Sequence, residues 1–238
     1  MKIENNILKI SNRFKTGYDA EAFIIESYFP LLNLSFNKIP EGTITTSTGT
    51  SKTPEGFLLR NSKKIALVEI KMIQRRFEGV DTDTFEILKT DDAIRRQVKK
   101  AKIQLCENDI NFPKIVVLVM NDLLDDSDTV HCGLFGKYET LFVGNKKQFE
   151  GYRGSVNENN DENLFSDNLL SGVIVYIPQK IDIDGKFVES YETLIYTNEI
   201  TNNFPKEIFK DSHILEHWKY NKDNGKLYIK LAQGNLNP

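Results

Sequence analysis

The feature that most constrains the fold is a pair of short apolar segments joined by a polar link. Pro54-Glu55 leads into Phe57–Leu59, and the second segment, Ile65–Lys71, carries Glu69 and Lys71 at its end. Residues 60–63 are polar and few enough for a hairpin turn. Side chains alternate across a strand, so Glu69 and Lys71 must share one face. Antiparallel pairing would bring Glu55 close to Glu69, so two acids and one lysine are expected to meet at a sheet edge.

Periodic segments flank this hairpin on both sides. A helix is predicted over Tyr18–Phe29, ended by Pro30, with Glu21 at the border of its apolar stripe. A second helix is predicted over Asp91–Cys106, and the β-branched run Lys114–Met120 has the length of a buried strand. Helix, strand, strand, helix and strand in this order predict an α/β fold, with a central mixed sheet flanked by helices.

The second half of the chain is expected to add strands and a helix to the same domain. The predicted elements are a hairpin of Val173–Ile177 and Tyr191–Tyr196, a helix over Pro205–Tyr220 and a strand over Lys226–Leu231. We therefore expect one domain over residues 1–238, with a core at 15–120 and a C-terminal elaboration at 121–238.

Composition narrows the class of protein. Hydrophobic residues make up 39% and charged residues 27% of the 238 residues, which is typical of globular proteins. The longest aliphatic run, 115–120, is too short to span a bilayer, and residues 1–6 lack the apolar segment of a signal peptide, so a cytoplasmic protein without a membrane partner is expected. A net charge of −3 argues against nonspecific coating of nucleic acid but is compatible with a local basic groove.

Pro54-Glu55 followed by Glu69-Ile70-Lys71 resembles the signature of the PD-(D/E)XK nuclease superfamily, which has the restriction-endonuclease-like fold. Glu21 and Gln97, on the two predicted helices, match in order and placement an acid and a glutamine that flank this signature in the family. The resemblance covers residues 15–120. The family usually has Asp where this chain has Glu55, whose side chain is one methylene longer.

The resemblance implies a Mg²⁺-dependent endonuclease that hydrolyses DNA, with a role in restriction or phage defence by analogy. The implied metal ligands are Glu55, Glu69 and the carbonyl of Ile70, with Mn²⁺ able to replace Mg²⁺. Lys71 would orient the attacking water, Glu21 would bind a metal-coordinated water or a second ion, and Gln97 would bind phosphate or steady Lys71. The implied catalytic set is Glu21, Glu55, Glu69, Lys71 and Gln97. Cleavage of both strands of a duplex would favour a homodimer.

Basic residues near the signature are expected to contact DNA phosphates. They are Arg75, Arg76, Arg95, Arg96, Lys99, Lys100 and Lys102. A solvated helix face is the alternative explanation for such a charge run. By themselves, Glu69 and Lys71 would make an ordinary ion pair.

Two other functions fit parts of the sequence. One is a nucleic-acid-binding protein on the same fold with weakened catalysis. The other is a zinc peptidase that uses His213 and His217 of an H-x-x-E-H pattern, which also occurs by chance on surface helices.

Overall fold

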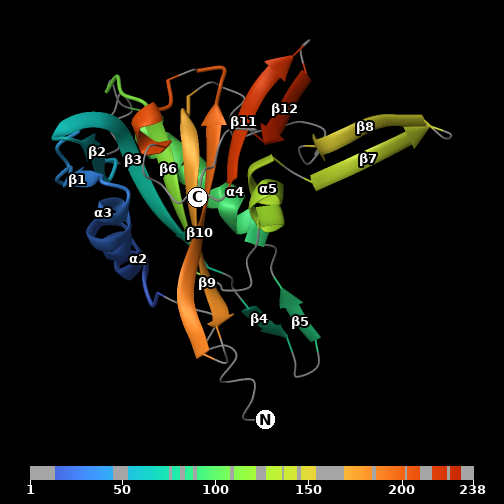
Figure 1. Ribbon diagram of the computed structural model, residues 1–238, viewed down its shortest axis with the longest axis horizontal. Helices are drawn as coiled ribbons and strands as arrows, with labels where there is room; N and C mark the ends of the chain where they lie inside the picture. The colour runs from blue at the N-terminus through green and yellow to red at the C-terminus, as the bar shows by residue number, and fades with distance from the viewer. Residues whose placement is uncertain are drawn as a thin grey trace.

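A mixed β-sheet organises the chain in this computed structural model (Figure 1). The structure describes residues 14–44, 53–74, 77–80, 84–87, 90–107, 110–121, 127–135, 137–143, 146–153, 169–183, 186–201, 203–209, 216–223 and 226–231. Within these residues the sheet has eight strands in the order β1-β2-β3-β6-β9-β10-β11-β12.

The first half of the sheet contains the predicted hairpin. Strands β1 (Ser35–Lys38), β2 (Gly56–Arg60) and β3 (Lys63–Ile73) pair antiparallel in sequence order. Strand β6 (Lys114–Met120) then pairs parallel to β3. The intervening helix α4 (Thr90–Cys106) makes the long connection that parallel strands require.

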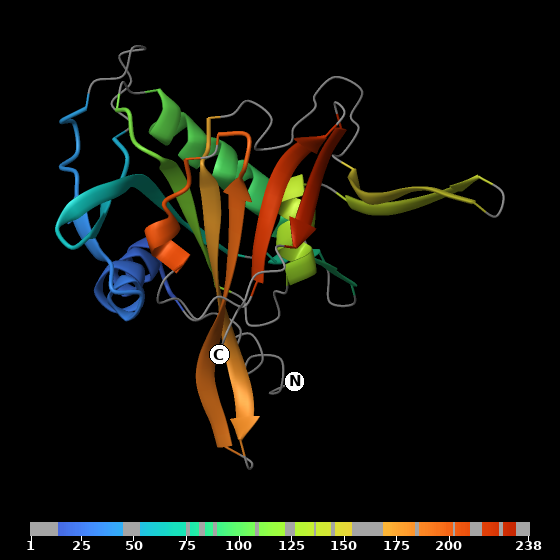
Figure 2. The same ribbon diagram turned by 45° about the horizontal axis from the view of Figure 1, so that its top comes forward.

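The second half continues the same sheet. Strand β9 (Gly172–Ile183) is parallel to β6 and forms a long hairpin with β10 (Lys186–Asn198), whose far end projects beyond the rest of the sheet (Figure 2). Strand β11 (Glu216–Asp223) pairs parallel to β10, and β12 (Lys226–Leu231) pairs antiparallel to β11.

Helices cover both faces of the sheet. On one face lie α2 (Gly17–Phe23), the π-helical segment η1 (Ile24–Tyr28) and α3 (Phe29–Leu31), and their buried residues pack against Val68, Ile70 and Val117. On the other face lie α4 and α5 (Ser127–Phe135). The apolar stripe of α4 is fully buried there, against Leu67, Ile73 and Val116; it consists of Ile94, Val98, Ala101 and Leu105. Because β3 and β6 are covered on both sides, their central residues are apolar with few exceptions.

The predicted fold class is confirmed as α/β, with a mixed sheet flanked by helices. The hairpin of β2 and β3, helix α4, strand β6, the hairpin of β9 and β10, and strand β12 all occur where the sequence predicts them. No helix in the described part of the chain is long and apolar enough to cross a membrane. Cys106 and Cys132 are free thiols.

The first helix does not end at Pro30, contrary to the prediction. Helical structure continues through Pro30 to Leu31 because the turn before it widens into a π-helix, in which the Phe29 N–H bonds to the Ile24 carbonyl. Proline has no N–H and its ring would clash with the carbonyl four residues earlier. A wider turn relieves that clash.

The predicted helix over Pro205–Tyr220 is wrong. A short 3-10 helix, η2 (Lys206–Phe209), is followed after residues outside the description by strand β11. Trp218 and Tyr220 are good strand formers at alternating positions, and the edge of β10 supplies their backbone partners.

Other elements were not predicted. The segment between β3 and α4 contains a hairpin of β4 (Phe77–Val80) and β5 (Thr84–Ile87). A further hairpin of β7 (Lys137–Val143) and β8 (Lys146–Arg153) follows α5 and projects from the body of the protein (Figure 1).

Candidate active site

The pairing of β2 with β3 places Glu55 beside Glu69, as predicted. Gly56 lies opposite Val68, and the Glu55 N–H donates to Glu69 Oε2 at 2.9 Å. Strand β2 begins at Gly56, whereas β3 runs on to Ile73. Within the described residues, β3 therefore has no partner from β2 beyond Val68. This leaves an open edge next to the two acids.

Glu69 is a buried acid within a strand, and not the weakly packed strand-end acid that the sequence suggests. Its side chain is 0% exposed, and Lys71 Nζ donates to Glu69 Oε1 from the same face of β3. Burial raises the pKa of Glu69, and the Lys71 ammonium and the Glu55 N–H oppose that rise. Both oxygens of this carboxylate therefore have fixed partners.

Helix α2 lies on the face of the sheet opposite α4 and brings Glu21 close to Glu55. A capping box starts this helix: the Asp19 N–H donates to Thr16 Oγ1 at 3.2 Å, and the Thr16 N–H donates to Asp19 Oδ2 at 2.9 Å. The preceding chain is anchored by Asn121, whose side chain accepts from the Phe14 N–H and donates to the Phe14 carbonyl. These bonds set where α2 begins and therefore where Glu21 lies.

Lys38 of β1 joins these acids, and the sequence gave no indication of it. Its Nζ donates to Glu21 Oε1 at 2.7 Å and lies 3.8 Å from Glu55 Oε2. The hydrogen bond to Glu21 raises the pKa of Lys38. Lys38 pairs across the strands with Gly56. A Cβ at Gly56 would lie 2.4 Å from the Asn37 carbonyl oxygen, so glycine permits this close approach of β1 and β2.

Glu55 is a cleft acid whose pKa is strongly raised. Burial raises the pKa of Glu55 from 4.5 to about 7, the nearby charges of Glu21 and Glu69 add to the rise, and Lys38 opposes it. Acids crowded in this way create a negative potential that a cation would relieve. Glu55 therefore changes charge near neutral pH.

One cleft of about 550 Å³ collects most of the predicted catalytic side chains. Because it opens at the free edge of β3, α2 reaches it from one face of the sheet and α4 from the other. The predicted residues that line it are Glu21, Glu55, Ile70, Lys71 and Gln97. Gln97, half-buried on α4, thus shares the cleft with Lys71. Glu69 lies directly behind Lys71, through the ion pair described above.

No protein-family model, curated protein or solved structure matches this chain.

The fit of the cleft to Mg²⁺ can be judged from its donors. The carboxylates of Glu55 and Glu69 and the Ile70 carbonyl are oxygen donors, which hard cations prefer. The raised pKa of Glu55 indicates that a positive charge beside this carboxylate is favourable. Among the described residues, no three acidic, histidine or cysteine side chains already form a metal-binding group. The ammonium groups of Lys38 and Lys71 lie against the acids instead. The donor set thus suits the ion once these contacts rearrange.

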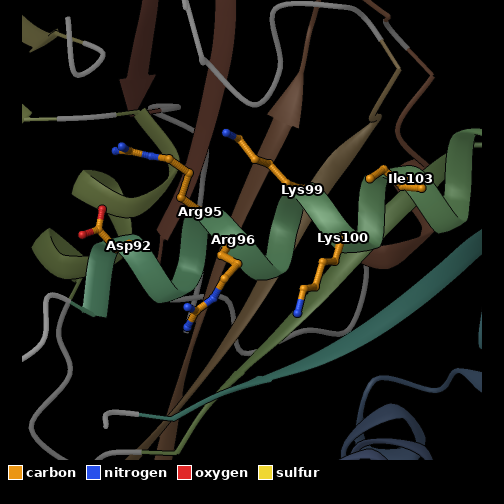
Figure 3. Close-up of a pocket in the computed structure, with 6 residues that line it drawn as sticks. All are labelled: Asp92, Arg95, Arg96, Lys99, Lys100 and Ile103. Carbon is orange, nitrogen blue, oxygen red and sulfur yellow. The ribbon is translucent and has the colours of Figure 1, made fainter. Parts of the chain in front are cut away.

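The predicted DNA-binding residues divide into three groups. Arg75 and Arg76 lie outside the described residues. Arg96, on α4, lines the cleft together with Gln97. The other basic residues of α4 surround or adjoin a second, shallow groove of about 380 Å³ on its outer face (Figure 3); its lining residues are Asp92, Arg95, Arg96, Lys99, Lys100 and Ile103. Arg95 also donates to the Cys132 carbonyl of α5 at 3.3 Å. Lys102 is half-buried on the same helix.

The zinc-peptidase hypothesis loses its structural basis. It needs two histidines on one helix, but His217 lies on strand β11 and His213 lies outside the described residues. His217 Nε2 is 3.0 Å from Thr197 Oγ1, whose hydroxyl donates to Glu199. Burial, with the charge of Lys219, lowers the pKa of His217 to about 4.

Proposed function

We propose that this protein is a Mg²⁺-dependent endonuclease that hydrolyses DNA and has the restriction-endonuclease-like fold of the PD-(D/E)XK superfamily. One observation carries the proposal: side chains from α2, β3, α4 and the segment before β2 converge on one cleft, and each was named from the sequence. A same-face ion pair alone would not bring Glu21 and Gln97 to the same place. The elements α2, β2, β3, α4 and β6, with β1, β4 and β5 between them, support the fold assignment, since they contain the predicted order of helix, strand, strand, helix and strand.

In the proposed reaction, Glu55, Glu69 and the Ile70 carbonyl hold the metal ion. The chemistry that a bound Mg²⁺ supplies is polarisation of a phosphate oxygen and a lower pKa for a coordinated water. Carboxylate and carbonyl ligands also suit Mn²⁺, whereas Ca²⁺ should bind but support little hydrolysis.

The remaining side chains would act directly on water and phosphate. Lys71, held by Glu69, orients the attacking water and offsets the negative charge that grows on the phosphate. Gln97 can donate to a phosphate oxygen through its amide nitrogen. Glu21, which now pairs with Lys38, would accept a hydrogen bond from metal-coordinated water.

The test is plasmid cleavage by wild-type protein, Glu69→Gln and Lys71→Ala. Gln keeps the size of Glu69 and an acceptor for the Glu55 N–H, so the fold should survive, whereas Ala would leave a buried gap behind Lys71. Wild-type protein should cut with Mg²⁺ or Mn²⁺ and stop in EDTA. Both variants should be inactive, and the control Glu26→Gln, at an exposed position on η1, should be active. Full cleavage in EDTA, or by Glu69→Gln, would refute the proposal.

A second candidate is a DNA-binding protein on the same fold with weakened catalysis. The observation in its favour is that Lys38 already forms ion pairs with Glu21 and Glu55. Mn²⁺ binding that is lost in Glu55→Gln would favour the nuclease, and DNA binding without Mn²⁺ binding would favour the second candidate. A cytoplasmic role in restriction or defence, and a homodimer that cuts both strands, belong to the nuclease proposal.

A further inference from the structure

The cleft and the groove on α4 adjoin each other through a single residue. Arg96 lines the cleft beside Gln97 and also lines the groove. In Figure 3, Arg96 and Lys100 extend to one side of α4, and Arg95 and Lys99 extend to the other. Arg96 and Lys100 therefore form the row of cations on the side of the cleft.

The spacing of this row fits a chain of phosphates. Arg96 and Lys100 are four residues apart, which separates them by about 6 Å along the helix axis. Both are exposed, and within the described part of the chain neither makes an ion pair. An arginine can hold a phosphate with two parallel hydrogen bonds, and a lysine adds a point charge.

The charge distribution explains why such a row is needed. The acids of the cleft, Glu21, Glu55 and Glu69, repel a polyanion, and Lys38 and Lys71 offset only part of their charge. A substrate phosphate must therefore be held by cations just outside the acids. Arg96 lies at that boundary.

We propose that Arg96 and Lys100 form a phosphate subsite, which binds the two successive backbone phosphates next to the one positioned for hydrolysis, one at each cation. This inference rests on the proposed function and specifies its substrate as a polynucleotide that spans both hollows. A mononucleotide or an isolated phosphate ester would leave the subsite empty and should be a poor substrate.

The experiment measures binding and cleavage of a short DNA duplex. Binding is measured on the Glu69→Gln background, with and without Arg96→Gln and Lys100→Gln together, across a range of salt concentrations. The matched control is Lys63→Gln with Lys64→Gln, which removes two exposed charges from the hairpin between β2 and β3.

Loss of two phosphate contacts should make the negative slope of log affinity against log salt shallower by about 1.8. When Lys100→Gln is combined with Arg96→Lys in place of Arg96→Gln, one of the two charges is kept, and about half of the lost slope should return. A set of duplexes, each with one uncharged methylphosphonate, should locate the contacts. Two successive positions adjoining the cut bond should weaken binding to the background protein and have no effect when Arg96 and Lys100 are replaced.

The outcomes separate the two proposals. If cleavage depends on Glu69 but the double replacement matches the control in affinity and slope, the subsite is refuted and the nuclease stands. An equal effect of methylphosphonate at every position also refutes the subsite. If DNA binds through Arg96 and Lys100 but wild-type protein does not cut it, the nuclease is refuted, and with it a subsite beside a cut bond. Absence of any DNA binding refutes both.

Discussion

Replacing Glu55 with glutamine should make the protein more stable at pH 8 and leave its stability at pH 5 nearly unchanged. Burial and the charges of Glu21 and Glu69 raise the pKa of Glu55 from 4.5 to about 7. Between those pH values the folded protein keeps a proton on Glu55 that the unfolded chain has lost. The free energy of unfolding therefore falls as pH rises through this window, and the whole penalty is present above pH 7.

The size of the effect follows from the pKa and the exposure. The rise in the pKa of Glu55 from 4.5 to about 7 sets an upper limit of about 3.5 kcal/mol, at about 1.4 kcal/mol per pKa unit. The Glu55 side chain is 24% exposed, so solvent screens part of this repulsion. We expect Glu55→Gln to gain about 1–2 kcal/mol at pH 8, because glutamine carries no charge at either pH.

The assay is urea unfolding of both proteins at pH 5 and pH 8 without divalent cations. Glu26→Gln is the matched control, since it makes the same chemical change at an exposed position on η1 and should show no pH-dependent gain. Equal stability of Glu55→Gln and wild type at pH 8 would refute the reasoning, as would a gain of the same size at pH 5. Either result would mean that burial and the neighbouring acids do not raise the pKa of Glu55 in the folded protein.

Three further predictions concern the same cleft. Gln97→Leu keeps similar bulk and should slow single-turnover cleavage about tenfold or more, the scale of about 1.5–3 kcal/mol for a hydrogen bond to a charged group; a wild-type rate would make Gln97 only a boundary residue. Lys38→Met removes a charge that opposes the raised pKa of Glu55, so the midpoint of the pH–rate profile should move to higher pH, and an unmoved midpoint would exclude this coupling. Gly56→Ala forces β1 away from β2 and should destabilise the protein by about 1–3 kcal/mol in urea unfolding. The control Gly17→Ala has no atom within 4 Å of the new Cβ and should not destabilise it. Equal stability of the two variants would contradict the close approach of β1 and β2.

Local periodicity predicted the elements that support the cleft. Strand β6 has the bounds that its β-branched run indicates, and α4 buries the stripe that its spacing indicates. Antiparallel pairing of β2 and β3 followed from their apolar runs and the short turn, and it placed Glu55 beside Glu69. Each of these features depends on residues close together in the chain.

The failed predictions share a dependence on distant partners. The segment that forms β11 becomes a strand because β10 offers it a free edge. Helical structure passes Pro30 because the helix widens within a packed layer. The burial of Glu69 results from packing on both faces of β3. This burial is the reason that Glu69→Gln is a better test variant than Glu69→Ala.

The sequence by itself determined the candidate residues of the cleft: strand alternation put Glu69 and Lys71 on one face, and the resemblance to the nuclease signature added Glu21 and Gln97. Only the tertiary structure decided which charges meet there. Lys38 reaches Glu21 across strands and helices with no shared motif, and Asn121 anchors Phe14 from 107 residues away. Arg96 lines both the cleft and the groove only after α4 packs beside the open edge of β3. Local sequence patterns contain no information on such distances, because these contacts form only when the sheet and its two helical layers assemble.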